Sequence, residues 1–148
     1  PFQWHGNHAF ADAFSLVRAP TAYFVDSPAL ISDTEARVQW DGALSPEIQA
    51  TPGSTHRLLF DVQYRAGAQG AWIDWLTDRP AESAIFTVGA CTGERAYAFR
   101  VRSRAEQLDG SGAWPNHRYP GVWSELASIV LTSQTVCVPR AYLPLVLQ

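Results

Sequence analysis

A strict two-residue alternation in the segment Tyr97–Ala105 constrains the fold of this chain more than any other feature. The letters YAFRVRSRA place apolar or small side chains at every second position, and the positions between them include Arg100, Arg102 and Arg104. Successive side chains of a β-strand point to opposite faces, so this pattern predicts a strand with one buried face. We therefore expect a layered β-structure around this strand.

Six more segments carry strand signals, and turn residues separate them. Two of these segments flank the turn AGAQG and predict a hairpin. About seven short strands in one chain predict an all-β fold, specifically a seven-stranded antiparallel β-sandwich. In chain order the six are Ala19–Asp26, Glu35–Gly42, Leu58–Gly67, Ala71–Leu76, Ser83–Val88 and Leu126–Thr132.

Length and composition agree with one such domain. The 148 residues suit a single core, and ten prolines, ten glycines and 12% aromatic residues are typical of an all-β fold with many turns. The sequence predicts an N-terminal extension over 1–18, a sandwich over 19–133 and a C-terminal apolar extension over 134–148. A net charge of −3 gives no indication of nucleic-acid binding, and no apolar stretch approaches the ~18 residues of a membrane span.

The chain ends in the apolar sequence AYLPLVLQ, Ala141–Gln148. Large uncovered apolar patches are usually interaction surfaces, so we expect this segment to form an eighth strand. Pro144 favours an edge position because it lacks a backbone N–H. The strand completes either its own domain or that of a neighbouring copy, and the neighbour is favoured. The candidate assembly residues are Tyr142, Leu143, Leu145, Val146 and Leu147.

The chain contains no methionine and begins with proline, which indicates a processed N-terminus or an engineered boundary. Processing fits export, so we expect a secreted or cell-surface protein. In an exported protein Cys91 and Cys137 can form a disulfide, and two unpaired buried thiols are the alternative.

Three stretches resemble the fibronectin type III family, most closely the domains repeated in large secreted bacterial proteins. They are FDVQYRAGAQGAWIDWL, FTVGACTGERAYAFRVRSRA and GVWSELASIVLTS, and the resemblance extends over Ala19–Ser133. Its most specific elements are Trp40, Tyr97 and the pair Trp123–Ser124. The resemblance implies a seven-stranded sandwich with Trp40 in the core. It also implies that Tyr97 forms a tyrosine corner, in which the phenol hydroxyl bonds to nearby backbone.

The same resemblance bears on the cysteines. Family members usually carry a leucine six residues before the corner tyrosine, and this chain has Cys91 there. In the family fold that turn lies at the same pole as the end of the last strand, which Cys137 follows. The resemblance therefore implies a Cys91–Cys137 disulfide, which would stabilise the domain by a few kcal/mol by closing a loop of about 45 residues. The long segment Glu106–Val122 departs from the family, whose loop there is usually shorter.

The arginine strand allows two interpretations. Asp61, Gln63 and Arg65 are expected on the same face as the arginines, and arginine planes can stack on Trp72 or Trp123, as in family members with a WS element. Structural stacking is favoured over an anion-binding stripe. In WIDW, a tryptophan under the arginines is likewise favoured over an exposed sugar-binding platform. The predicted structural residues are Trp40, Tyr97, Arg100, Arg102 and Trp123.

Signals for catalysis and metal binding are weak. WHGNH places His5 and His8 three apart, but a zinc site needs three or four ligands, and no further partner is evident in the sequence. The chain has neither a GxSxG motif nor a glycine-rich phosphate loop. We therefore expect no enzyme activity, no metal and no cofactor.

The best candidate for a recognition surface is the long loop SGAWPNHRYPGVW. Its side chains are of types favoured at interface hot spots, and Pro115 and Pro120 lower the ordering cost of binding. The alternative is that its aromatic residues fold back over the sheet edge. The candidate binding residues are Trp114, His117, Arg118 and Tyr119.

Two functions follow as hypotheses. The first is a non-enzymatic extracellular structural or assembly module, a surface or filament subunit that self-associates by strand addition through its terminal extensions. Its partners are other protein chains, above all copies of itself. The alternative is a carbohydrate- or protein-binding accessory domain of a larger secreted enzyme or adhesin, with polysaccharide as a further partner.

Overall fold

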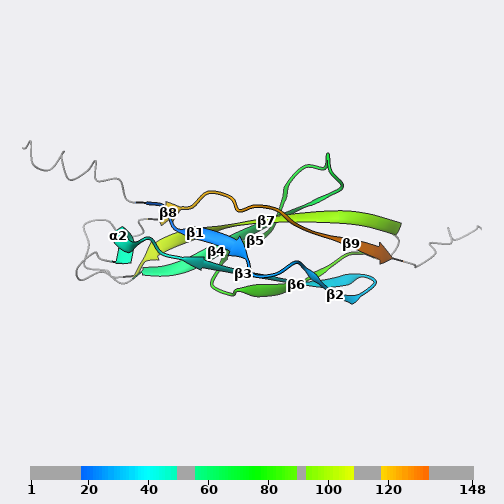
Figure 1. The fold of residues 1–148 in the computed structure, drawn as a ribbon, viewed down its shortest axis with the longest axis horizontal. Helices are drawn as coiled ribbons and strands as arrows, with labels where there is room; N and C mark the ends of the chain where they lie inside the picture. The colour runs from blue at the N-terminus through cyan, green and yellow to red at the C-terminus, as the bar shows by residue number, and fades with distance from the viewer. Residues whose placement is uncertain (1–17, 50–55, 90–92, 109–117, 134–148) are drawn as a thin grey trace, which may run out of the picture.

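The computed structural model describes residues 18–49, 56–89, 93–108 and 118–133. These residues form two antiparallel β-sheets and one short helix, so the predicted all-β class is confirmed. The strands run along the long axis of the molecule (Figure 1). The extensions over 1–17 and 134–148 lie outside the described residues.

The first sheet is built around its central strand β3. Its strands are β1 (Thr21–Phe24), β2 (Ala29–Ser32), β3 (Glu35–Ala43) and β6 (Ser83–Thr87). β1 pairs with the C-terminal part of β3 and β2 with its N-terminal part. The Val25 N–H donates to the Gln39 carbonyl (3.2 Å), whereas the Trp40 N–H donates to the Glu82 carbonyl (2.8 Å). Because adjacent residues of a strand point their backbone groups to opposite sides, β1 and β2 follow one another along one side of β3, and β6 lies on the other.

The second sheet has the order β5-β4-β7, with β8 and β9 both paired to the far side of β7. β8 pairs near the C-terminal end of β7, where Pro120 lies opposite Arg104, and β9 pairs near its N-terminal end, where Ser133 lies opposite Gly93. The helix α2 (Pro46–Gln49) lies between β3 and β4 in the chain. The strand bounds are β4 (His56–Ala66), β5 (Ile73–Arg79), β7 (Gly93–Gln107), β8 (Arg118–Pro120) and β9 (Ala127–Ser133).

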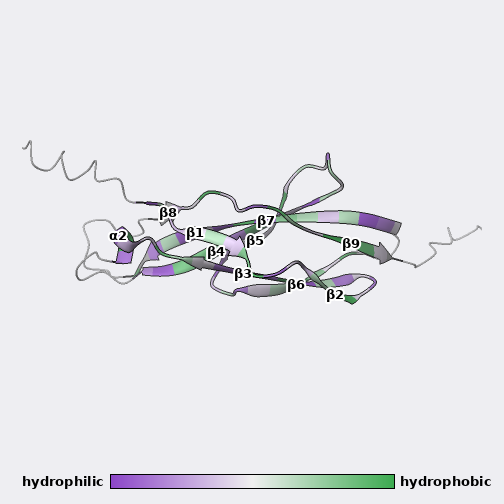
Figure 2. Cartoon of the chain, viewed as in Figure 1, coloured by the Kyte–Doolittle hydropathy of each residue, from purple (hydrophilic) through white to green (hydrophobic). Residues whose placement is uncertain are grey.

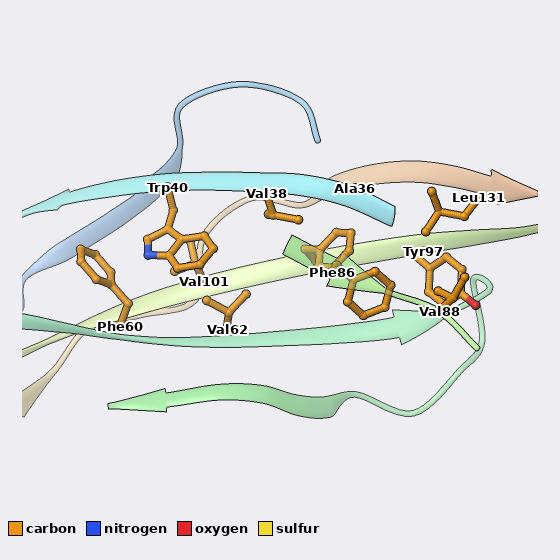
Figure 3. Close-up of a cluster of buried hydrophobic side chains, with 11 residues drawn as sticks. Ala36, Val38, Trp40, Phe60, Val62, Phe86, Val88, Tyr97, Val101 and Leu131 are labelled. Carbon is orange, nitrogen blue, oxygen red and sulfur yellow. The ribbon is translucent and has the colours of Figure 1, made fainter. Parts of the chain in front are cut away.

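The hydrophobic core lies between the two sheets, and the two-residue alternation supplies it. Hydrophilic and hydrophobic residues alternate along β4 and β7 (Figure 2). Trp40 points toward Phe60 (Figure 3), with 6.4 Å between their ring centroids, and its indole N–H donates to the Ala81 carbonyl at 2.9 Å. A buried tryptophan thus keeps its one polar group satisfied. The buried cluster is Ala36, Val38, Trp40, Phe60, Val62, Phe86, Val88, Tyr97, Phe99, Val101 and Leu131.

The described residues form nine strand segments rather than the expected seven, because two short segments escaped sequence analysis. All four residues of β2 are exposed, so its sequence ALIS carries no alternation of buried and solvent-facing positions. β8 is only three residues long and includes Pro120. Short edge segments of this kind lack the two-residue pattern on which the sequence prediction rests.

Candidate functional site

The outer face of the second sheet carries the largest group of charged and aromatic side chains that the sequence singled out. The antiparallel register of β4 and β7 places Arg100 opposite Gln63 and Arg102 opposite Asp61. Directly opposed residues share a face of the sheet, and these four point away from the core. The expectation that β4 supplies the neighbours of the arginines is therefore correct.

Asp61 is the electrostatic centre of this face. Its residue is only 2% exposed, although sequence analysis placed it on the solvent side. Arg102 Nε–H donates to Asp61 Oδ2 at 2.8 Å, Arg104 Nε–H donates to the same oxygen at 2.7 Å, and the Asp78 N–H donates to Oδ1 at 3.1 Å. Arg104 also approaches the Asp78 carboxylate at 3.3 Å. The two arginines cover the carboxylate and exclude water from it, which sequence spacing alone does not reveal.

The balance of two opposing effects lowers the pKa of Asp61. Burial on its own raises the pKa, because it disfavours the charged carboxylate. Hydrogen bonds from Arg102 and Arg104, the Asp78 N–H and the charge of Arg104 favour the ionised form, and together they hold the pKa below its ordinary value. Asp61 is therefore an anion that the fold requires, and it does not store a proton at neutral pH.

This lowered pKa predicts an acid-sensitive component of stability. The unfolded carboxyl group titrates at about 3.9, above its value in the folded protein, so the ionised group stabilises the fold above that pH. The contribution is lost as the pH falls through the folded pKa. We expect the free energy of unfolding, measured by urea denaturation, to decline below about pH 5, and part of that decline to disappear in Asp61→Asn. Identical acid slopes for the two proteins would contradict this assignment.

An alternating stack of arginine and tryptophan runs beside Asp61, and we call it the Arg–Trp ladder. Arg100 lies over both the Trp72 ring (4.3 Å from guanidinium carbon to centroid) and the Trp123 ring (4.5 Å). Arg65 lies over Trp72 at 4.8 Å, and Arg102 lies over Trp123 at 4.7 Å. The ladder is thus Arg65, Trp72, Arg100, Trp123 and Arg102. The stacking expected from the sequence is present on both tryptophans.

Arg100 is the central member of the Arg–Trp ladder. Its Nε and Nη2 groups donate to Gln63 Oε1 at 2.8 and 2.6 Å, and Gln63 Nε2 donates to Asp74 Oδ1 at 2.7 Å. Burial, followed by the positive charges of Arg102 and Arg65, lowers the pKa of Arg100. A guanidinium nevertheless remains charged at neutral pH. The stack therefore concentrates positive charge. The π-faces of the tryptophan rings and the side-chain carbonyl of Gln63 compensate this charge.

The WS pair holds Trp123 in the Arg–Trp ladder. The Ser124 N–H donates to the Val101 carbonyl at 2.8 Å, and the Val101 N–H donates to Ser124 Oγ at 3.1 Å. In the stretch between β8 and β9, Ser124 thereby takes the place of regular strand pairing with β7. Nearby, a Cβ on Gly121 would lie 2.3 Å from the Pro20 carbonyl oxygen, so a residue without a side chain is required there. Sequence analysis identified the WS letters but missed these roles of Ser124 and Gly121.

The two tryptophans of WIDW have different surroundings. Trp75 packs against the core, with ring centroids 6.3 Å from Trp40 and 5.3 Å from Phe86. Trp72 instead carries the guanidinium groups of Arg65 and Arg100. Trp72 is therefore the tryptophan under the arginines that the sequence favoured. Its stacked ring leaves little surface as a platform for a sugar.

Other predicted site residues fall partly outside the described chain. Tyr97 is buried, with its ring 5.2 Å from that of Phe86, and its tyrosine-corner hydrogen bond remains a prediction. For Arg118 and Tyr119 only the backbone is described, and it pairs with Glu106 and Ala105. The remaining predicted residues lie outside the described ranges: His5, His8, Cys91, Trp114, His117, Cys137, Tyr142, Leu143, Leu145, Val146 and Leu147.

Two hollows share Leu126, which precedes β9. The larger, about 430 Å³, is a groove between residues 22–27, which include part of β1, and Ser124–Ala127. Tyr23, Val25 and Leu126 at this groove are each at least half exposed. The smaller, about 260 Å³, borders Arg65 at the end of the Arg–Trp ladder. Both hollows combine apolar lining with nearby edge-strand backbone.

Comparison of the sequence with protein-family models and with curated proteins found no match. Within the described ranges, no helix is long and apolar enough to cross a membrane. In the same part of the chain, no three histidine, cysteine or acidic side chains gather as metal ligands.

Proposed function

We propose that this chain is a non-enzymatic extracellular structural module that self-associates by strand addition through its terminal extensions. The observation that carries the proposal is the exposed side of the sandwich. Among the described residues β1 and β2 pair only with β3, and β9 pairs only with β7, so the other edge of each is available to a further strand. A terminal segment of a neighbouring copy is the kind of peptide that such an edge accepts.

We further propose that the sandwich is of the fibronectin type III kind. In this interpretation β1 and β2 are two parts of one interrupted strand, and β8 and β9 are two parts of another, which reduces the nine segments to the family's seven strands. The placement of Trp40 in the core and of Trp123 in the Arg–Trp ladder supports this interpretation. Because Gly93 lies opposite Ser133, the segments that carry Cys91 and Cys137 leave the sheet at the same end, which supports the proposed disulfide.

Exposed apolar side chains along the same side of the sandwich support association there. Leu30 on the edge strand β2 is 60% exposed and Val130 on the edge strand β9 is 52% exposed, and Tyr23, Val25 and Leu126 of the 430 Å³ groove are exposed as well. Apolar side chains that are this accessible gain by being covered, at roughly 25 cal/mol per Å² of surface removed from water. A carbohydrate-binding function receives less support, because two guanidinium groups already occupy Trp72.

Light scattering of the full chain over a range of concentrations tests this function. We expect the mean mass to rise with concentration and the rise to disappear in the double variant Leu143→Asp/Leu145→Asp, because charged side chains oppose burial of the terminal strand. Ile85→Asp is the matched control, since Ile85 is an exposed apolar residue on the opposite edge strand β6. A native chain that stays monomeric at high concentration would refute the proposal.

A further inference from the structure

The geometry points to an open position at the Arg65 end of the Arg–Trp ladder, built to receive one more aromatic ring. We propose that Tyr142 of the C-terminal segment Ala141–Gln148 occupies it. The hollow is thus a docking position for the C-terminal segment. The inference rests on the proposed function only in one respect, namely that a second copy supplies this segment.

The hollow beside Arg65 has the size and lining that a ring requires. Its volume is about 260 Å³. Its floor consists of the small residues Ala96 and Ala98 on β7, and within the described residues Ala96 is exposed and Ala98 half-buried. Leu126, about half exposed, forms an apolar wall. The remaining lining residues are Gly67, Ala68, Tyr97 and Ser128.

The spacing of the Arg–Trp ladder places this hollow where the next ring would lie. Outward-facing positions on β7 run from Arg102 through Arg100 and Ala98 to Ala96, and Arg65 on β4 lies opposite Ala98. Among the described residues, tryptophan rings stack on the guanidinium groups as far as Arg65 and no further. Beyond Arg65 the floor continues with alanine, so the face is prepared for a ring that the described residues do not supply.

Arg65 carries a second sign of a missing neighbour. Its Nε is buried and makes no hydrogen bond within the described part of the chain. A buried N–H donor without an acceptor is costly, and native proteins rarely leave one. An aromatic ring in the hollow would cover the face of the guanidinium, and a hydrogen-bond acceptor beside that ring would satisfy Nε once the Arg65 side chain turns toward it. A peptide carrying an aromatic side chain has both groups, since its backbone carbonyls are acceptors.

The C-terminal segment has the reach to fill this position. The described chain ends at Ser133, opposite Gly93, and Ser128 of the hollow lies five residues before it on β9. Tyr142 follows Ser133 by nine residues, which span up to roughly 30 Å when extended, so the ring can return to the hollow within one molecule or reach that of a second copy. A strand added along β9 would alternate its side chains, with Tyr142 on the ladder face and Leu143 toward the gap between the sheets.

A photocrosslinking experiment on the full chain tests the occupant. With p-benzoylphenylalanine at Tyr142, irradiation and cleavage after arginine are expected to join the terminal peptide Ala141–Gln148 to the peptide Ala96–Arg100. The same amino acid at Trp4 or Trp114 tests two other aromatic residues outside the described chain, and at Ile85 it serves as a control on the opposite edge. Crosslinks to Ala96–Arg100 from position 4 or 114 but not from 142 would overturn the proposal. Crosslinks from 142 only to peptides that do not line the hollow would overturn it as well.

A variant that fills the hollow provides an independent check. In the chain with p-benzoylphenylalanine at Tyr142, Ala96→Trp should block the position and lower the yield of the crosslink to Ala66–Arg95, the peptide that contains the Ala68 side of the hollow, by about fivefold. Glu94→Trp is the matched control, since position 94 is exposed, lies on the same face and does not line the hollow. An unchanged yield in a folded Ala96→Trp protein would overturn the proposal.

Mixing copies of natural and heavy-nitrogen composition separates this inference from the proposed function. Crosslinked peptides of mixed isotope composition show that the segment comes from a second copy, which supports both proposals. Crosslinks to the hollow without mixed products support the docking position and refute association through this segment. Concentration-dependent association without any crosslink from position 142 to the hollow supports self-association and refutes the docking position.

Discussion

Replacing Asp61 by asparagine is expected to lower the free energy of unfolding by about 3 kcal/mol, measured by urea denaturation at pH 7. Asparagine preserves the size of the side chain but removes the charge that faces Arg102 and Arg104. Breaking a buried ion pair on one side typically costs about 3–5 kcal/mol, because the partner charges stay without compensation. We take the lower end because the Arg102 and Arg104 side chains remain 31% and 19% exposed.

Asp74→Asn provides the comparison for this prediction. Asp74 lies on the neighbouring strand β5, is exposed and accepts a hydrogen bond from Gln63 at 2.7 Å. Because water can replace that contact, we expect a change within about 0.5 kcal/mol. Equal losses for the two substitutions would mean that the arginines gain no more from Asp61 than from solvent.

Replacing Arg100 by alanine is expected to cost about 2 kcal/mol, the second largest effect. The substitution removes the guanidinium that stacks on both Trp72 and Trp123, together with two hydrogen bonds to Gln63. It also exposes both indole rings to water. We expect the tryptophan fluorescence of the folded variant to shift to longer wavelength, with the stability loss measured in the same denaturation series.

Two further variants distinguish stacking from charge. Arg100→Lys keeps the positive charge but lacks the planar group and its fixed donors, so we expect it to recover less than half of the loss. Arg37→Ala removes an exposed arginine on β3 and should stay within about 0.5 kcal/mol of the native protein. Full recovery with lysine would show that Arg100 acts through its charge alone.

The alternation of side chains was enough to predict the all-β class and the two faces of the central strands. It identified the inward residues Phe60 and Val62 of β4 and the outward arginines of β7, because a strand with one buried face imposes a period of two on its sequence. The expectation that the arginines could stack on Trp72 or Trp123 came from the family resemblance as well, and Arg100 stacks on both rings. The alternation in β4 and β7 is a property of each strand on its own.

Features that depend on distant segments were not predictable in this way. Asp61 looks like a solvent-facing residue in its strand, and only the arginines of β7 reveal that it is buried. The close approach of Gly121 to the Pro20 carbonyl joins segments about a hundred positions apart. The division of one edge into β1 and β2 depends on the partner strand β3 and leaves no periodic signal of its own.

The Arg–Trp ladder also determines how the chain meets proteases that cut after arginine. Such an enzyme must draw the arginine side chain into its own specificity pocket and extend the backbone around it. Arg65, Arg100 and Arg102 are held by stacking on indole rings, and β7 is paired on both sides. Cleavage at these positions must therefore wait for the sheet to open, so the digestion rate there reports the free energy of opening. The arginine-rich face of the molecule is thereby protected from enzymes that recognise arginine.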